Sequence, residues 1–184
     1  WGAIGARTTE SQVHRQLASG MSMPIGFKNG TDGNVDVAIH AASSAASPHF
    51  FFGTSDDGQP SVVETAGNQH CHIILRGGSQ GPNWDAESVA QATDKLGDNA
   101  RLMIDASHAN SGKDHLRQVE VTRGIVKQIA NGNEHIAGIM MESFLEGGAQ
   151  SLDAKGKDGL TYGQSITGAC MDIDDTVDLL AELA

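Results

Sequence analysis

Cysteine, proline and aromatic residues are scarce in this sequence of 184 residues. The two cysteines, Cys71 and Cys170, are too few for the disulfide framework on which small secreted domains depend. We therefore expect a reducing, cytoplasmic environment. No apolar run approaches the roughly 20 residues that cross a bilayer, so we expect no membrane-spanning segment, no signal peptide and no membrane partner.

Positive charge is also in short supply. Twelve Lys and Arg face 23 Asp and Glu, which gives a net charge of -11 at pH 7. A nucleic-acid partner is not expected, because it requires a basic surface. A small anion is compatible with the composition, since a few local cations can bind phosphate inside an acidic protein. With 39% apolar residues and a mean hydropathy of -0.27, the chain can form one soluble domain with a sizeable core.

A repeated local pattern indicates the fold class. A short apolar run is followed by one charged or coordinating residue and then by a turn. The clearest copy is Cys71-His72-Ile73-Ile74-Leu75-Arg76-Gly77-Gly78, and similar segments lie at 4–7, 25–28, 103–108 and 139–142. Such runs are typical of parallel strands buried on both faces. Functional residues at the carboxyl ends of these strands are typical of a (β/α)8, or TIM, barrel.

Helical segments alternate with these predicted strands. A capping box, Thr9-Glu10-Ser11-Gln12, predicts the start of the first helix. Further helices are expected at about 35–46, 85–96, 113–131 and from 174 onward. In the last of them we expect Val177, Leu180 and Leu183 to face inward.

Two strand-like runs interrupt the alternation. Residues 49–53 and 61–65 are joined by Ser55-Asp56-Asp57-Gly58, and Asp-Gly between such runs predicts a β-hairpin. We interpret residues 49–65 as an inserted hairpin outside the barrel. Only five barrel strands are then counted, whereas a closed eight-stranded barrel takes at least about 200 residues. The chain is therefore expected to form part of a barrel, about five βα units.

Three cations occupy matching positions at predicted strand ends. Arg7, Lys28 and Arg76 have no acidic residue beside them in the sequence. Convergence of three cations is costly unless an anion joins them, which favours phosphate or carboxylate substrates. The alternative is that each cation pairs with a barrel carboxylate such as Asp105 or Glu142. Matching positions in three strands favour the anion site.

His108 and Glu142 also end predicted strands, and imidazole with carboxylate suits a divalent transition metal. Neither residue is specific alone, because a single histidine is more often structural. His70 and His72 flank Cys71 and suggest a metal cluster at first sight. Strand alternation separates the cysteine from both histidines, so we interpret the histidines as packing residues.

Several long motifs, in order, resemble class I 3-deoxy-D-arabino-heptulosonate-7-phosphate (DAHP) synthase. They are Gly2-Ala3-Ile4-Gly5-Ala6-Arg7-Thr8-Thr9-Glu10-Ser11, Gly26-Phe27-Lys28-Asn29-Gly30-Thr31-Asp32-Gly33, Ile74-Leu75-Arg76-Gly77-Gly78, Asp105-Ala106-Ser107-His108-Ala109-Asn110-Ser111, Glu142-Ser143 and Tyr162-Gly163-Gln164-Ser165-Ile166-Thr167. The resemblance implies that residues 1–184 form the C-terminal portion of one barrel. It also implies the first step of the shikimate pathway, condensation of phosphoenolpyruvate with erythrose 4-phosphate.

The resemblance assigns roles to individual residues. Phosphoenolpyruvate is expected at Gly5, Ala6, Arg7, Lys28 and Arg76. His108 and Glu142 are expected to be two of four ligands of a divalent metal, Mn²⁺ or Fe²⁺. Lys28, Arg76 and His108 are then the expected catalytic residues; Lys28 either handles a proton or only binds phosphate. A homo-oligomer is expected.

Two departures from the family pattern bear on activity. The cysteine ligand and a Lys-Pro-Arg-Thr substrate motif belong to an N-terminal half that this sequence does not include. The aspartate ligand falls on Gly168, which offers no donor, and Asp172 is the nearest substitute. We expect the chain alone to be inactive. The alternatives are an inactive barrel fragment that acts as an assembly or regulatory partner, and a related octulosonate-phosphate synthase that uses another aldehyde.

The resemblance also predicts regulation by an aromatic amino acid. The expected effector residues are Leu17, Met21, Ser22, Phe51, Gly53 and Val63. Gly53 leaves room for a phenol hydroxyl where phenylalanine-sensitive members tend to carry Ser, which favours tyrosine. The alternative is that these residues only pack the hairpin against the barrel.

Overall fold

The computed structural model describes residues 1–97, 100–152 and 156–183. Five strands form one sheet in the order β1-β2-β5-β6-β7, and all four pairings are parallel. These strands are β1 (Gly2–Ile4), β2 (Ile25–Lys28), β5 (His72–Leu75), β6 (Leu102–Asp105) and β7 (Ile136–Met140). The carboxyl ends of all five strands therefore lie at one edge of the sheet. The predicted parallel α/β fold is confirmed.

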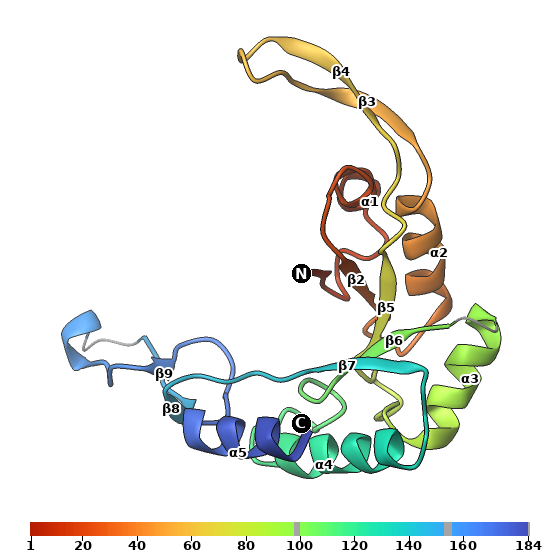
Figure 1. The fold of residues 1–184 in the computed structure, drawn as a ribbon. Helices are drawn as coiled ribbons and strands as arrows, with labels where there is room; N and C mark the ends of the chain where they lie inside the picture. Colours follow the sequence, from red (N-terminus) through yellow and green to blue (C-terminus); the bar gives the residue numbers. More distant parts are fainter. Residues whose placement is uncertain (98–99, 153–155, 184) are drawn as a thin grey trace.

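Helices connect the strands of this sheet. They are α1 (Gln12–Ser19), α2 (Asp36–Ala45), α3 (Ala86–Leu96) and α4 (Arg117–Ala130). After β7 come β8 (Glu146–Ala149), a short 3-10 turn at Lys157–Gly159, β9 (Gln164–Ser165) and α5 (Ile173–Leu183). Figure 1 shows α2, α3 and α4 on the same side of the curving sheet. No helix within the described residues is long and apolar enough to span a membrane.

The core lies between the sheet and these helices. Phe27, Ile73 and Ile104 come from three neighbouring strands, and their side chains are fully buried. Ala38 and Ala41 of α2 are equally buried, and their small side chains let this helix lie close to the sheet. Burial of such strand residues stabilises each side chain by about 1.5–3 kcal/mol. The core thereby fixes the five strand ends at one edge.

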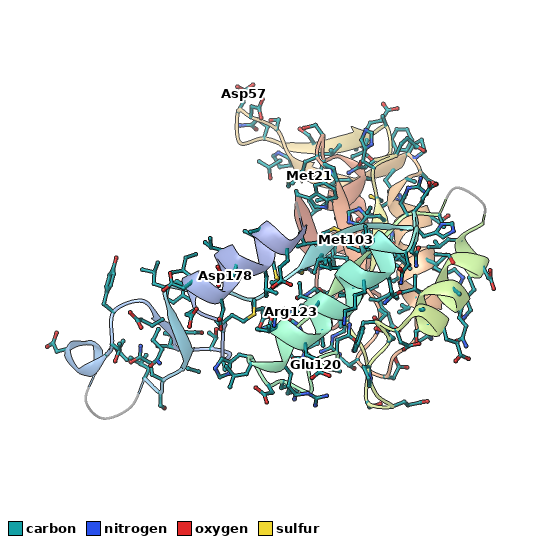
Figure 2. The ribbon with its side chains drawn as sticks, turned by 60° about the horizontal axis from the view of Figure 1, so that its bottom comes forward. Met21, Asp57, Met103, Glu120, Arg123 and Asp178 are labelled. Atoms are coloured by element: carbon teal, nitrogen blue, oxygen red, sulfur yellow. The ribbon has the colours of Figure 1, made fainter. Side chains whose placement is uncertain are left out.

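An antiparallel hairpin lies outside the parallel sheet. Strands β3 (His49–Thr54) and β4 (Pro60–Thr65) pair from His49 with Thr65 to Thr54 with Pro60. Figure 1 shows the hairpin projecting from the rest of the fold, and Figure 2 labels Asp57 at its tip. Its side chains alternate between two faces, so Phe51 and Phe52 point to opposite sides.

Two helix details differ from the sequence-based expectations. The side chain that caps α1 is Ser11, which accepts from the backbone N–H of His14, and not Thr9. The inward face expected for α5 is wrong for two of its three residues: Val177 and Leu180 are 56% and 52% exposed, whereas Leu183 is half-buried and Thr176 and Leu179 are buried. The reason is the way α5 meets α4.

The packing of α5 on α4 sets which face of α5 is covered. Arg123 on α4, labelled in Figure 2, donates three hydrogen bonds of 2.7–3.1 Å to the Glu182 carboxylate of α5. On α5, Thr176 and Leu179 are buried, whereas Ile173, Val177 and Leu180 remain exposed. Helix periodicity alone reveals an apolar stripe but does not say what covers it.

Candidate active site

The predicted cations converge at the carboxyl edge of the sheet. Arg7 follows β1, Lys28 ends β2 and Arg76 follows β5, which neighbours β2. All three line one cavity of about 500 Å³, together with Gly5, Ala6, Thr31, Gly78, Ser79, His108, Ala109 and Lys113. No Asp or Glu belongs to this lining. The structure therefore brings together the five residues expected to bind phosphoenolpyruvate.

Arg76 carries a buried charge with spare hydrogen-bonding capacity. The residue is 8% exposed, and its Nη1 donates to the Gly77 carbonyl at 3.3 Å. Its Nε finds no acceptor among the described residues. Burial lowers the pKa of Arg76; the Asp105 charge opposes this change and the Arg7 charge adds to it. A buried guanidinium with an unused N–H suits an anionic ligand.

Lys28 has a carboxylate partner. Its Nζ donates to Asp105 Oδ2 at 2.6 Å, and the Asp105 side chain is fully buried. The alternative of carboxylate pairing therefore holds for Lys28. Within the described residues neither Arg7 nor Arg76 forms a salt bridge. The cavity thus keeps positive charge for a ligand after Lys28 is paired.

Asp105 is the most densely hydrogen-bonded carboxylate of the site. Its Oδ2 also accepts from His108 Nδ1 at 2.9 Å, and its Oδ1 accepts from the Ser107 backbone N–H and hydroxyl at 2.9 and 2.5 Å. Burial by itself would raise the pKa of Asp105. The hydrogen bonds from His108, Lys28 and Ser107 and the positive charge of Lys28 outweigh burial, so the pKa lies well below its usual range.

His108 and Glu142 meet in a second cavity of about 730 Å³. His108 Nε2 lies 3.7 Å from Glu142 Oε1. With metal–ligand bonds of about 2.1 Å, two ligands of one ion can lie up to about 4.2 Å apart, so these two residues fit part of a metal site. In the described residues no third His, Cys, Asp or Glu is placed to complete it. Gly168 also lines this cavity, but it has no side chain that could bind a metal.

Asp172 occupies a helix cap. Its Oδ1 accepts from the backbone N–H of Asp175 at 2.8 Å, which caps the start of α5. The residues that line the cavity of His108 and Glu142 do not include Asp172. Its use as a substitute ligand would compete with this cap.

The two cavities adjoin. Arg7, His108 and Lys113 line both of them. Lys113 was missed by the sequence reading, and the backbone N–H of Lys113 donates to the His108 carbonyl at 2.7 Å. His108 and Lys113 have φ angles of 54° and 63° and are the only described non-glycine residues with positive φ. Such conformations concentrate at functional sites.

Three asparagines join the loops after β2, β5 and β6. Asn29 Oδ1 accepts from the Arg76 backbone N–H at 2.8 Å and from Asn83 Nδ2 at 3.2 Å. Asn110 accepts from the Asn83 backbone N–H and donates to the Asp105 carbonyl, both at 2.8 Å. These residues were also missed, although Asn29 directly follows β2. They fix the backbone that presents Arg76 and Asp105 to the cavity.

Cys71, His70 and His72 do not form a metal site. His72 Nε2 accepts from the Trp1 indole N–H at 3.2 Å, and the two rings meet edge to face at 5.5 Å. His72 therefore packs as expected, whereas His70 is exposed and its predicted packing role is wrong. Burial raises the pKa of the Cys71 thiol to about 11, which disfavours the thiolate that a metal needs.

A third cavity lies between α1 and the hairpin. Its volume is about 620 Å³, and its lining includes all six residues expected to hold an effector: Leu17, Met21, Ser22, Phe51, Gly53 and Val63. The lining is mainly apolar, with polar groups such as Ser19 and Glu64. A Cβ atom on Gly53 would approach Val63 Cγ2 to 2.6 Å. The absence of a side chain at Gly53 thereby makes room for the Val63 side chain.

Comparison with known proteins gives a consistent family. The model of the DAHP synthetase I family matches residues 1–181. The chain is 72% identical over 189 residues to the phospho-2-dehydro-3-deoxyheptonate aldolase of Corynebacterium glutamicum, and this match covers all of the chain and 52% of that relative. It is 52% identical over 187 residues to the Phe-sensitive aldolase of Escherichia coli K12, of which 53% is covered.

A solved structure agrees with the sequence matches. The phospho-2-dehydro-3-deoxyheptonate aldolase of Francisella tularensis superposes with a TM-score of 0.92 at 49% identity, and the match covers all of this chain and 53% of that one. The chain thus spans about half the length of the relatives that it matches. A family match over nearly every residue, with the expected cations gathered in one cavity, leads to one conclusion: the chain belongs to the DAHP synthetase I family.

Proposed function

We propose that this chain supplies the C-terminal portion of a DAHP synthase, which condenses phosphoenolpyruvate with erythrose 4-phosphate. The observation that carries the proposal is the pair of adjoining cavities. One gathers cations, and the other holds His108 and Glu142, with Arg7, His108 and Lys113 shared. Phosphoenolpyruvate in the first cavity can thus meet the aldehyde of erythrose 4-phosphate where the two cavities adjoin.

The second part of the proposal is that residues 1–184 form about five βα units of one (β/α)8 barrel. Strands β1 and β7 are the outer strands of the sheet and each has a single neighbour in it. Ala3 on β1 is exposed, and Met103 on β6 and Met140 on β7 are half-buried. On α5, Ile173, Val177 and Leu180 are exposed. Further strands and helices would cover these surfaces.

Arg7 and Arg76 bind and orient the phosphate and carboxylate of phosphoenolpyruvate in this mechanism. Fixing the donor beside the aldehyde removes much of the entropy cost of a bimolecular reaction. C3 of phosphoenolpyruvate attacks the aldehyde carbon, water adds at C2 and inorganic phosphate leaves. Lys28, held by Asp105 at 2.6 Å, contributes positive charge and is the candidate for proton handling.

A divalent metal, Mn²⁺ or Fe²⁺, belongs to this proposal. When bound, it would act as a Lewis acid on the aldehyde oxygen. His108 and Glu142 are the residues of this chain that would hold it, at the 3.7 Å separation described above. Gly168 supplies no third ligand, so the chain by itself offers an incomplete set.

The cavity between α1 and the hairpin is the proposed effector site. An apolar cavity with a few polar groups suits an aromatic amino acid. Gly53 has no side chain where phenylalanine-sensitive members tend to carry Ser, and this difference favours tyrosine over phenylalanine. Relatives named Phe-sensitive and Trp-sensitive show that feedback sensitivity occurs among similar proteins.

We also propose a homo-oligomer in the cytoplasm. Phe50, Phe52 and Val62 are 66%, 91% and 64% exposed and lie on the hairpin face opposite the effector cavity. Large apolar side chains gathered on a projecting element are typical of protein interfaces.

The function is tested with a hybrid enzyme, in which this chain is joined to the half of the Corynebacterium glutamicum relative that it does not match. We expect metal-dependent phosphate release that requires both phosphoenolpyruvate and erythrose 4-phosphate. Replacing erythrose 4-phosphate by arabinose 5-phosphate, the aldehyde of octulosonate-phosphate synthases, is expected to abolish release. A folded hybrid that binds neither metal nor phosphoenolpyruvate would favour the alternative of an inactive assembly partner.

A further inference from the structure

One buried carboxylate joins the two halves of the proposed site. Asp105 stands at the end of β6, whereas Lys28 stands at the end of β2, with β5 between them in the sheet. Asp105 Oδ2 nevertheless accepts from Lys28 Nζ at 2.6 Å and from His108 Nδ1 at 2.9 Å. A single oxygen atom therefore touches both the candidate proton-handling residue and the candidate metal ligand.

The hydrogen bonds around Asp105 determine which nitrogen of His108 carries the proton. The Ser107 hydroxyl has one hydrogen, and it donates that hydrogen to Asp105 Oδ1 at a distance of 2.5 Å. Ser107 Oγ, 2.6 Å from His108 Nδ1, then acts as an acceptor. Asp105 Oδ2 is a second acceptor that lies within hydrogen-bond distance of His108 Nδ1. Nδ1 must carry the proton, which leaves a lone pair on Nε2.

The lone pair faces the functional side of the ring. His108 Nε2 points toward Glu142 Oε1, 3.7 Å away, in the cavity that both residues line. Neutral imidazole binds a metal through an unprotonated nitrogen, and its other N–H is commonly held by a carboxylate. The tautomer that Asp105 imposes is the one that a metal ligand requires.

We propose that Asp105 is the positioning residue of this site: it fixes the Nδ1–H tautomer of His108 and holds Lys28 at the same carboxylate oxygen. The effect of Asp105 on metal binding and catalysis rests on the proposed function. The tautomer of His108 can be measured whether or not the protein is active. Ser107 supports Asp105 from the opposite oxygen. His108 and Lys28 are thereby set relative to each other by one side chain.

The Asp105→Asn variant tests the proposal in the hybrid enzyme. The amide oxygen stays with the fixed backbone N–H of Ser107, so the amide NH₂ turns toward His108 and the Lys28 ammonium, which can only donate, loses its acceptor. A donor facing His108 Nδ1 moves the ring proton to Nε2, as carboxylate-to-amide changes beside a histidine do in other enzymes. We expect Mn²⁺ affinity to fall by about 10- to 100-fold.

The tautomer is read directly by nitrogen-15 NMR of histidine-labelled, metal-free protein at about pH 8, where an ordinary histidine is neutral. We expect Nδ1–H in the unsubstituted hybrid and Nε2–H in Asp105→Asn. The matched control is Asp36→Asn, which breaks an exposed pair with Lys95 at 2.8 Å by the same chemical change. This control is expected to leave both the tautomer and Mn²⁺ affinity unchanged.

Two results would overturn the proposal. One is an Nε2–H tautomer of His108 in the unsubstituted protein, which needs no variant and therefore decides even if Asp105→Asn does not fold. The other is a folded Asp105→Asn variant that keeps Nδ1–H and the original Mn²⁺ affinity. Absence of phosphate release together with the expected tautomers would refute the proposed function and leave the positioning role intact.

Discussion

Arg76 is a buried cation with an unused N–H among the described residues. Its guanidinium is buried and its Nε lacks an acceptor. We expect Arg76→Ala in the hybrid enzyme to weaken phosphoenolpyruvate binding by about 2–4 kcal/mol, or about 30- to 700-fold. Calorimetric titration measures this loss, and exposed Arg101→Ala is the control. Unchanged affinity in a folded Arg76→Ala variant would refute the anion site.

Gly168 lies in the cavity of the proposed metal site and has no side chain to contribute to it. A Cβ added at Gly168 would lie 3.8 Å from Glu142 Oε2, and its backbone is not in the left-handed region, so an Asp fits. We expect Gly168→Asp in the hybrid to tighten Mn²⁺ binding about tenfold or more, since even indirect ligand changes shift affinity by 10–100-fold. A Mn²⁺ titration followed by electron paramagnetic resonance measures the change.

The control for this prediction is Gly168→Asn, which has the same shape and a weaker donor. If the unsubstituted hybrid already binds Mn²⁺ as tightly as the Asp variant, then another residue such as Asp172 completes the site. Asp172→Asn would then weaken Mn²⁺ binding while an amide oxygen still caps α5.

The hairpin is the element on which the proposed regulation depends. Gly53 and Phe51 face the cavity beside α1, whereas Phe52 is 91% exposed on the other face. We expect tyrosine to inhibit the hybrid more strongly than phenylalanine. Gly53→Ser is expected to weaken tyrosine inhibition roughly tenfold, because the added side chain would collide with Val63 and displace the cavity wall. Inhibition curves for both amino acids measure this preference.

A substitution on the opposite face separates regulation from packing. Phe52→Ser alters the same strand without entering the cavity, so it is expected to leave the inhibition constants unchanged. Inhibition by phenylalanine but not by tyrosine in the unsubstituted hybrid would reverse the predicted effector. No response to either amino acid would indicate that the cavity residues only pack the hairpin.

At the scale of the whole molecule, the 184-residue chain offers too few ligands for tight metal binding. His108 and Glu142 are the two that meet, and each must lose hydration for few bonds. We expect the chain alone to bind Mn²⁺ weakly or not at all and to form no DAHP. Mn²⁺ titration and a phosphate-release assay on the chain and the hybrid measure the difference. Comparable activity of the two proteins would contradict this expectation.

The sequence by itself determined the parallel α/β class and the edge at which function gathers. Apolar runs that end in Arg7, Lys28 and Arg76 are local signals, and parallel strands bring their carboxyl ends together whatever the details of packing. The family motifs likewise lie within continuous segments. For these reasons the cation cavity was predictable before the fold was seen.

Only the tertiary structure decided how these residues are partnered. The Lys28–Asp105 contact spans 77 positions of sequence and crosses an intervening strand, so it depends on strand register and on which face each side chain takes. The covered face of α5 likewise depends on its contact with α4, and the stripe of Val177 and Leu180 does not reveal that contact. Local patterns specify which groups reach the site, whereas packing between distant segments specifies which groups touch.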